Sequence, residues 1–455
     1  MVLANNIEGR GRQLLLPYAI YGAFAFLAMV LEKNDFFVAA GCVLLAAASV
    51  MGLYFYKKDQ SLVSFRFLLS VFWTAGEGLG VMQLSNLQSS WTNQTWLSFG
   101  GFYLLFLAGY EAIEIYLSKR VIVLESKCQM SKKEVTKEQF QNRLFCCICI
   151  VSLVTFATFV LEAVILGYVP LFSTETHAYD HFHISGVHYF TVSCMFTHSL
   201  TLIYMLTYTE RKKDRQPLEK GKLIQLIVYN ALSASIPILS VSKFQFVLTL
   251  ALPILIFLLM RPNVNKKKLF AMLGAAAAVF MTIRRNYEPG YLNSIFQMKN
   301  ENMPLFLQYA YMYIANNYSN FNCLTQALQQ GLVEHTFGLK QLFPVFALTG
   351  LKFVFPALVA FEMPVTIKEL NTLTLIYDAY YDFGLIGVFL FGLILGAVCA
   401  ALTQKIRKSS NPILYLFYAQ LALYLALSFF SSWFTVPTTW FWFALTGALY
   451  LYVKK

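Results

Sequence analysis

Apolar runs of membrane-spanning length recur along the whole chain, with short polar stretches between them. An α-helix of roughly 20 apolar residues crosses the hydrocarbon core of a bilayer. Inside that core the backbone polar groups have to be bonded within the protein, which favours helices. The pattern predicts an all-α, polytopic membrane protein. Twelve spans are expected, at 14–31, 36–56, 62–84, 96–116, 144–166, 188–208, 223–239, 244–260, 269–285, 379–403, 412–432 and 438–453.

The composition agrees with a membrane protein and argues against a nucleic-acid partner. The chain is 58% hydrophobic and only 13% charged, whereas a soluble domain carries about 25% charged residues. The net charge of +12 comes from cations that sit in short patches between the apolar runs. Such patches are typical of the cytoplasmic loops of membrane proteins.

The distribution of the cations predicts the orientation of the chain. If the N-terminus is inside, most of the 35 Lys and Arg residues fall in loops and tails on the cytoplasmic side, as the positive-inside rule requires. Both termini are then cytoplasmic, and residues 117–143 form a charged cytoplasmic connector. We expect one transmembrane domain over 1–455, with an extracytoplasmic loop at 286–378 that caps its site.

One further segment, from Leu342 to Ala360, is apolar enough to span. A span there would move the cations at 405–408 to the outside, against the charge rule. We therefore interpret this segment as a re-entrant or interfacial helix, in which Pro344 and Pro356 limit a straight span.

Three cations are expected near the outer membrane surface. Arg284 and Arg285 end the ninth span, and Lys243 lies in a polar break, 240–243, between the seventh and eighth spans. Cations in this position bind phosphate oxygens, and arginine does so in a bidentate way. Snorkelling to lipid head groups is the alternative interpretation.

Two charged residues, Arg66 and Glu77, fall inside the third span. They are about three helical turns apart, so they share a face without touching. Charges inside a membrane indicate function by default. Partners on other helices, with a purely structural role, explain them equally well.

The outer loop after the fifth span contains several candidate bases. His188, at the mouth of the sixth span, is the best placed general base, although a capping or packing role explains it equally well. A zinc site can be considered at His177, His181 and His183. Their spacing matches no recognised zinc pattern, so no metal is expected.

Asp378 and Asp382 lie four residues apart at the start of the tenth span, so they share one helix face. Negative charge suits a helix N-terminus, and this structural role is expected for Asp378. Asp382 is expected to pair with Arg284 or Arg285, with the binding of sugar hydroxyls as the alternative.

Four stretches of the chain resemble a known family. They are GYVPLFSTETHAYDHFHISGVHYF after the fifth span, SVSKFQFVL around Lys243, YIANNYSNFNCL in the large loop, and LNTLTLIYDAYYDFGLIGVFLFGLILG entering the tenth span. Over residues 167–396 the chain resembles the bacterial Wzy-type polymerases of O-antigen and capsule, the oligosaccharide repeat unit polymerases. Many relatives have a Gly-Ser-Arg-like turn where this chain has Ser240 to Lys243, so lysine replaces arginine here.

The resemblance implies a membrane glycosyltransferase that polymerises oligosaccharide repeats at the outer face of the bacterial inner membrane. Each repeat is linked to undecaprenyl pyrophosphate, and the product is O-antigen of lipopolysaccharide or a capsule. No cofactor is implied, and a flippase and a chain-length regulator are implied as partners. The pyrophosphate would be bound by Lys243, Arg284 and Arg285, and the acceptor hydroxyl would be activated by His188 or Asp382.

Sugar contacts are expected from the large outer loop, by stacking and hydrogen bonding. The residues expected to make them are Tyr287, Asn317, Tyr318, Asn320 and Tyr377. An ordered cap without a ligand is the alternative. For the whole protein, the alternatives are an O-antigen ligase, which uses the same donor, and a lipid-linked oligosaccharide flippase. A flippase would more often show related halves, and no such repeat is visible in the chain.

Overall fold

The computed structural model describes residues 2–124, 137–173, 178–210, 219–261, 291–409 and 411–454. Within these ranges the regular elements are α- and 3-10 helices, and an isolated β-bridge joins Ser85 to Met298. The expected span at 269–285 lies outside these ranges, as do Arg284, Arg285 and Tyr287.

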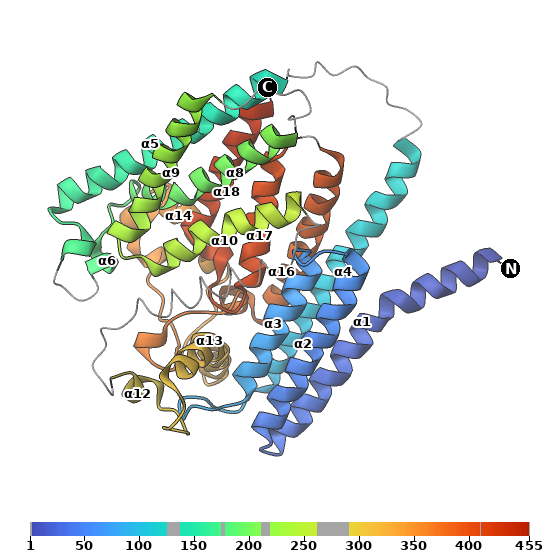
Figure 1. Ribbon diagram of the computed structural model, residues 1–455. Coiled ribbons are helices and arrows are strands. Elements are labelled where there is room, and N and C mark those ends of the chain that lie inside the picture. Colours follow the sequence, from blue (N-terminus) through green and yellow to red (C-terminus); the bar gives the residue numbers. More distant parts are fainter. Residues whose placement is uncertain are drawn as a thin grey trace. The chain divides into compact units, whose positions relative to one another are not determined.

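The chain forms two compact units, which are taken in turn below (Figure 1). The first unit comprises Met1–Leu124, Ala275–Gln404 and Tyr424–Pro437. The second comprises Glu125–Gly274, Lys405–Leu423 and Thr438–Lys455.

Seven helices in the described part of the chain are long and apolar enough to cross a membrane. They are Leu15–Lys33, Phe37–Asp59, Asn93–Leu117, Glu138–Leu166, His188–Tyr208, Lys220–Leu239 and Tyr377–Lys408. Each coincides with an expected span, so the chain is a helical membrane protein. Two more expected spans are shorter apolar helices, Phe244–Met260 and Ile413–Ala426, and the total of twelve stays a prediction.

The first unit is built on α1 (Val2–Lys33), α2 (Phe37–Asp59), α3 (Phe65–Val81) and α4 (Asn93–Leu124), drawn in blue to cyan in Figure 1. Two glycines allow α2 and α3 to approach closely. A Cβ on Gly41 would lie 2.6 Å from the carbonyl oxygen of Gly78, and a Cβ on Gly78 would lie 2.9 Å from that of Gly41. Small residues at such contacts let helices pack in a membrane, where no hydrophobic force drives them together.

One long helix and several short elements of the first unit precede its last membrane helix. They are α12 (Tyr291–Phe296), α13 (Leu305–Gln329), α14 (Leu339–Leu348), α15 (Leu351–Val354), η4 (Pro356–Leu358) and η5 (Lys368–Leu370). The first of these elements, α12, and the residues that follow it contact the turn between α3 and α4. Ser85 Oγ donates to the Phe296 carbonyl (2.6 Å), and the Lys299 N–H donates to the Leu84 carbonyl (2.9 Å). This turn lies at the end of α3 that the charge pattern predicts to be outside the cytoplasm.

Residues 342–360 do not form one straight helix. α14 contains Pro344 and continues to Leu348, and the chain then turns at Gly350, where φ is +78°. The short helix α15 follows, and Pro356 begins η4. The interruption predicted from the prolines is present, but it starts at a glycine, which tolerates the left-handed conformation that ends α14.

The last membrane helix of the first unit, α16 (Tyr377–Lys408), is broken near its start. Phe383 and Gly384 have non-helical backbone angles, and Gly384 has φ +59° and ψ −142°, a region open essentially to glycine alone. The break frees carbonyls that neighbouring residues satisfy. The Tyr381 carbonyl accepts from His335 Nδ1 (3.0 Å), and the Asp382 carbonyl accepts from the Phe337 N–H (3.3 Å).

The second unit packs α5 (Lys137–Leu166), α8 (Met195–Glu210), α9 (Lys220–Leu239) and α10 (Lys243–Met260) together. It also holds most of α17 (Ile413–Ala426) and α18 (Pro437–Lys454). Polar pairs join its helices, among them Ser233 Oγ to Thr197 Oγ1 (2.8 Å) and Gln141 Nε2 to Thr207 Oγ1 (2.9 Å). Such interhelical hydrogen bonds stabilise membrane bundles.

Candidate active site

The strongest candidate site lies in the second unit, where α5 ends. Between α5 and α8 the chain forms four short elements: η1 (Pro170–Phe172), α6 (Ala178–His181), α7 (His188–Thr191) and η2 (Val192–Cys194). Phe182 anchors this connection, because its ring is buried between the rings of Phe159 and Tyr168, with centroids 5.5 and 5.6 Å away. The connection is therefore a packed structure that can hold side chains in fixed positions.

His188 begins α7, and its imidazole is held by a buried carboxylate. Nδ1 lies 3.1 Å from Glu162 Oε1 and 3.3 Å from Oε2. Glu162, near the end of α5, has an exposed fraction of 0%. Its Oε1 also accepts from the Ile184 N–H at 3.1 Å. The carboxylate thus fixes both the ring of His188 and the backbone in front of it.

This geometry sets the tautomer of His188. An ionised carboxylate only accepts hydrogen bonds, so beside it a neutral His188 carries its proton on Nδ1 and its lone pair on Nε2. No described residue bonds Nε2, and 24% of the side chain is exposed. General bases are commonly built from a carboxylate that orients an imidazole and leaves its other nitrogen free of protein partners.

The other described histidines of this connection, His181 and His183, are not part of a metal-binding group. His183 lies near the dyad, with its ring centroid 6.1 Å from that of His188, and both His181 and His183 are exposed. His177 lies outside the described residues. Among the residues described, no group of three or more His, Cys, Asp or Glu side chains is arranged to hold a metal ion.

The polar break around Lys243 is a tight turn between α9 and α10. Val241 has φ +55°, which is rare and strained for a β-branched residue. Ser242 is buried and starts α10, because its Oγ accepts from the Gln245 N–H at 3.3 Å. Lys243 is the first residue of α10. Pyrophosphate binding by Lys243, Arg284 and Arg285 stays a prediction.

Asp382, in the first unit, caps a helix. It is fully buried, and its carboxylate accepts from the backbone N–H groups of Lys340 (3.1 Å) and Gln341 (2.8 Å) and from the hydroxyl of Thr336. These N–H groups belong to the first turn of α14, where a negative charge is favourable. In this conformation the carboxylate of Asp382 caps the N-terminus of α14. Its expected partners, Arg284 and Arg285, lie outside the described residues.

Asp378 lies in the first turn of α16, and its expected role at the helix dipole stays a prediction. It is buried, and the hydroxyl of Thr435 donates to its Oδ2 at 2.5 Å. Tyr377, a predicted sugar contact, is also buried, and its hydroxyl donates to the Pro364 carbonyl at 2.8 Å.

The asparagines of α13, predicted to bind sugars, bond to protein groups. Asn317 Nδ2 donates to the Phe429 carbonyl (2.5 Å), and Asn320 Nδ2 donates to the carbonyls of Leu370 (2.7 Å) and Thr372 (2.9 Å). Both side chains are fully buried. In this conformation they tie neighbouring loops to α13, so sugar binding by them stays a prediction.

Tyr318 inserts into a notch on α3. Its hydroxyl donates to the Trp73 carbonyl at 3.0 Å, and its ring covers Gly76 and Gly80. The side chain is fully buried. Nearby on α13, the Tyr311 hydroxyl donates to Gln88 Oε1 at 2.7 Å. Burial raises the pKa of Tyr311 to about 12, so it remains a donor at neutral pH. Tyr318 docks α13 onto α3, and Tyr311 docks it onto the turn between α3 and α4.

The two charges of the third span have partners on other helices. The Arg66 guanidinium bonds Asp59 (2.5 Å) and Glu114 (2.9 Å), and Glu77 accepts from the Tyr21 hydroxyl at 3.0 Å. The structural alternative for this pair therefore has direct support.

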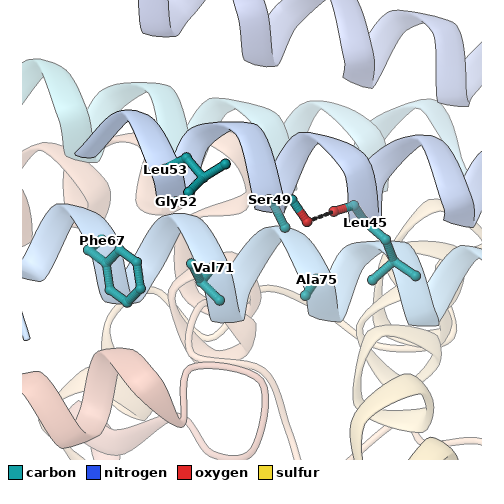
Figure 2. A pocket seen from close by; sticks show the side chains of 8 residues that line it. Leu45, Ser49, Gly52, Leu53, Phe67, Val71 and Ala75 are labelled. Atoms are coloured by element: carbon teal, nitrogen blue, oxygen red, sulfur yellow. Dashed lines mark hydrogen bonds between the residues drawn. The ribbon is translucent and has the colours of Figure 1, made fainter. Parts of the chain in front are cut away.

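A groove between α2 and α3 has about 490 Å³ of open volume (Figure 2). Its lining is apolar except for Ser49, whose hydroxyl donates to the Leu45 carbonyl of its own helix at 3.0 Å. It offers a saccharide no charged or free polar group, which a sugar site needs.

Glu162 is the candidate functional residue that the sequence did not lead us to select. It is a lone carboxylate in the apolar run that becomes α5. An ionisable residue inside a predicted span is a functional candidate by default, and this signal was sufficient to select it.

No family model matches the chain, and no match is found among curated proteins or solved structures. The function is therefore argued from the residues of this chain.

Proposed function

We propose that the protein is an oligosaccharide repeat unit polymerase. It would be a membrane glycosyltransferase that joins undecaprenyl-pyrophosphate-linked repeats into O-antigen or capsular polysaccharide at the outer face of the bacterial inner membrane. The observation that carries the proposal is the pair of His188 and Glu162 at the end of a membrane helix. The resemblance of residues 167–396 to this polymerase family supports the same reaction.

The dyad suits the acceptor side of this reaction. His188 Nε2 takes the proton from a sugar hydroxyl of the acceptor repeat. The hydroxyl oxygen attacks the anomeric carbon of the donor glycan, and the bond from that carbon to the pyrophosphate oxygen breaks with its electron pair. Glu162, bonded to Nδ1, stabilises the imidazolium that forms.

The leaving group needs positive charge, because its pyrophosphate gains negative charge as the bond breaks. Lys243 begins the helix that follows the turn at 240–242 and belongs to the same unit as the dyad. Together with Arg284 and Arg285 it keeps the predicted role of binding this pyrophosphate.

Two alternatives differ in chemistry or in acceptor. A flippase moves its substrate without breaking a bond and needs no general base, so the dyad favours a transferase. An O-antigen ligase would use the same donor and the same base with a lipid A-core acceptor. The acceptor therefore separates polymerase from ligase.

The test is a reaction of the purified protein in detergent with lipid-linked repeats as donor and acceptor. A polymerase extends the glycan in steps of one repeat and gives a ladder of products. Product that forms only after lipid A-core is added would identify a ligase. No covalent product from either mixture, together with translocation in vesicles, would identify a flippase and overturn the proposal.

A further inference from the structure

Gln245 links the element that carries His188 to the turn that leads into Lys243. Gln245 is buried on α10, two residues after Lys243. Its amide Nε2 donates to the Val192 carbonyl and lies 3.4 Å from Cys194 Sγ. Val192 and Cys194 belong to η2, which directly follows the single helical turn of His188.

The His188 element needs such a link because it is short. α7 contains only His188–Thr191, and η2 separates it from the long helix α8. A 3-10 segment has poorer hydrogen-bond geometry than an α-helix and often marks a hinge. The position of the imidazole therefore depends on contacts from outside its own helix.

Side-chain hydrogen bonds fix the start of α10, which carries Lys243. The Gln245 N–H donates to Ser242 Oγ at 3.3 Å, and Thr249 Oγ1 donates to the Gln245 carbonyl at 2.8 Å.

We infer that Gln245 is a positioning residue, which holds the His188 turn against the α9–α10 turn so that Nε2 keeps one fixed direction. The inference rests on the proposed function, because it assigns a reaction to His188. It adds a residue that couples the base for the acceptor to the turn expected to bind the donor. A misplacement of a base by about 1 Å is sufficient to lower a rate about 100-fold.

The test is a double-mutant cycle in the polymerisation assay. Gln245→Met keeps the length of the side chain and removes the donor. Gln245→Glu is nearly isosteric and places a carboxylate against the Val192 carbonyl, so it is a second variant in case the first folds poorly. Both variants are expected to lower the rate at saturating acceptor about 10-fold, with the acceptor KM within about twofold. In a His188→Ala background, Gln245→Met is expected to change the residual rate by less than about twofold.

Gln141→Met is the matched control. Gln141 is another buried glutamine of the second unit, and it donates to Thr207 Oγ1 at 2.9 Å. It lies about 30 Å from Glu162 along α5, so its replacement should leave the rate unchanged at equal melting temperature. The inference is wrong if Gln245→Met has the wild-type rate, or lowers the rate by the same factor with and without His188. A wild-type rate for His188→Ala alone would instead refute the proposed base.

Discussion

At the scale of single residues, the proposed reaction requires a charged Glu162 as well as the ring of His188. Glu162→Gln keeps the size of the side chain but removes the charge that fixes the tautomer and stabilises the imidazolium. We expect the rate of chain extension to fall about 100-fold or more, with little change in acceptor KM. Initial rates at several acceptor concentrations measure both quantities. A wild-type rate for this variant would refute the role given to the carboxylate.

Replacing Asp382 is expected to affect stability and not the reaction rate, because its carboxylate caps α14. Asp382→Ala should lower the free energy of unfolding by about 1 kcal/mol or more through the lost cap. Asp382→Asn keeps one oxygen acceptor and should be milder. Thermal unfolding in detergent and initial rates are measured on the same preparations. A loss of about 100-fold in rate without a loss of stability would instead identify Asp382 as a base.

The dyad shows why the site was only partly predictable at this scale. His188 was selected from its place at the start of a span. Its partner Glu162 lies 26 residues earlier, at the end of another helix, and the path of the chain between them brings the two together. The asparagines of α13 illustrate a different difficulty. In the sequence, a run of polar residues indicates a ligand-binding site. In the structure, the amide groups of these asparagines donate hydrogen bonds to backbone carbonyls of neighbouring loops.

At the scale of elements, the docking of α13 depends on the glycine notch in α3. A Cβ on Gly76 would lie 2.2 Å from the Tyr318 hydroxyl oxygen. Gly76→Ala should therefore cost about 1–3 kcal/mol of stability, read as a lower melting temperature. Adding Tyr318→Phe removes the nearest clashing atom but leaves two ring carbons 2.7 Å from the Cβ, so it should restore only part of this loss.

Gly22→Ala is the control for the notch, because nothing lies within 4 Å of a Cβ at Gly22 in α1. Alanine is also the better helix former, so this variant should be as stable as the wild type or slightly more stable. Equal melting temperatures for Gly76→Ala and Gly22→Ala would contradict the docking described here.

The elements were more predictable than their contacts. Long apolar runs give membrane helices whatever their neighbours are, so the seven helices coincide with expected spans. The short helices after α13 were less predictable, because their ends depend on special backbone conformations such as Gly350. The break in α16 at Gly384 was not predicted, since glycine is common in membrane helices and a single one does not indicate a break.

At the scale of the whole molecule, the orientation in the membrane is the next prediction. In a cysteine-free background, Asn300→Cys should react with an impermeant thiol reagent in intact spheroplasts. Gln60→Cys should react only after the membrane is opened, because it lies at the other end of the α3 bundle, beside Lys57 and Lys58. Both native side chains are exposed. The reverse labelling pattern would refute the orientation.

The central claim is that the His188–Glu162 dyad drives the joining of lipid-linked repeats, and a single comparison tests it most directly. The ladder of products is measured for the wild type, for His188→Ala and for His181→Ala, which removes an exposed histidine from the same connection. We expect the wild type and His181→Ala to give the same ladder of products at the same rate. We expect His188→Ala to form products at least about 100-fold more slowly at matched protein level. A normal ladder from His188→Ala, or none from the wild type with active substrates, would contradict the account.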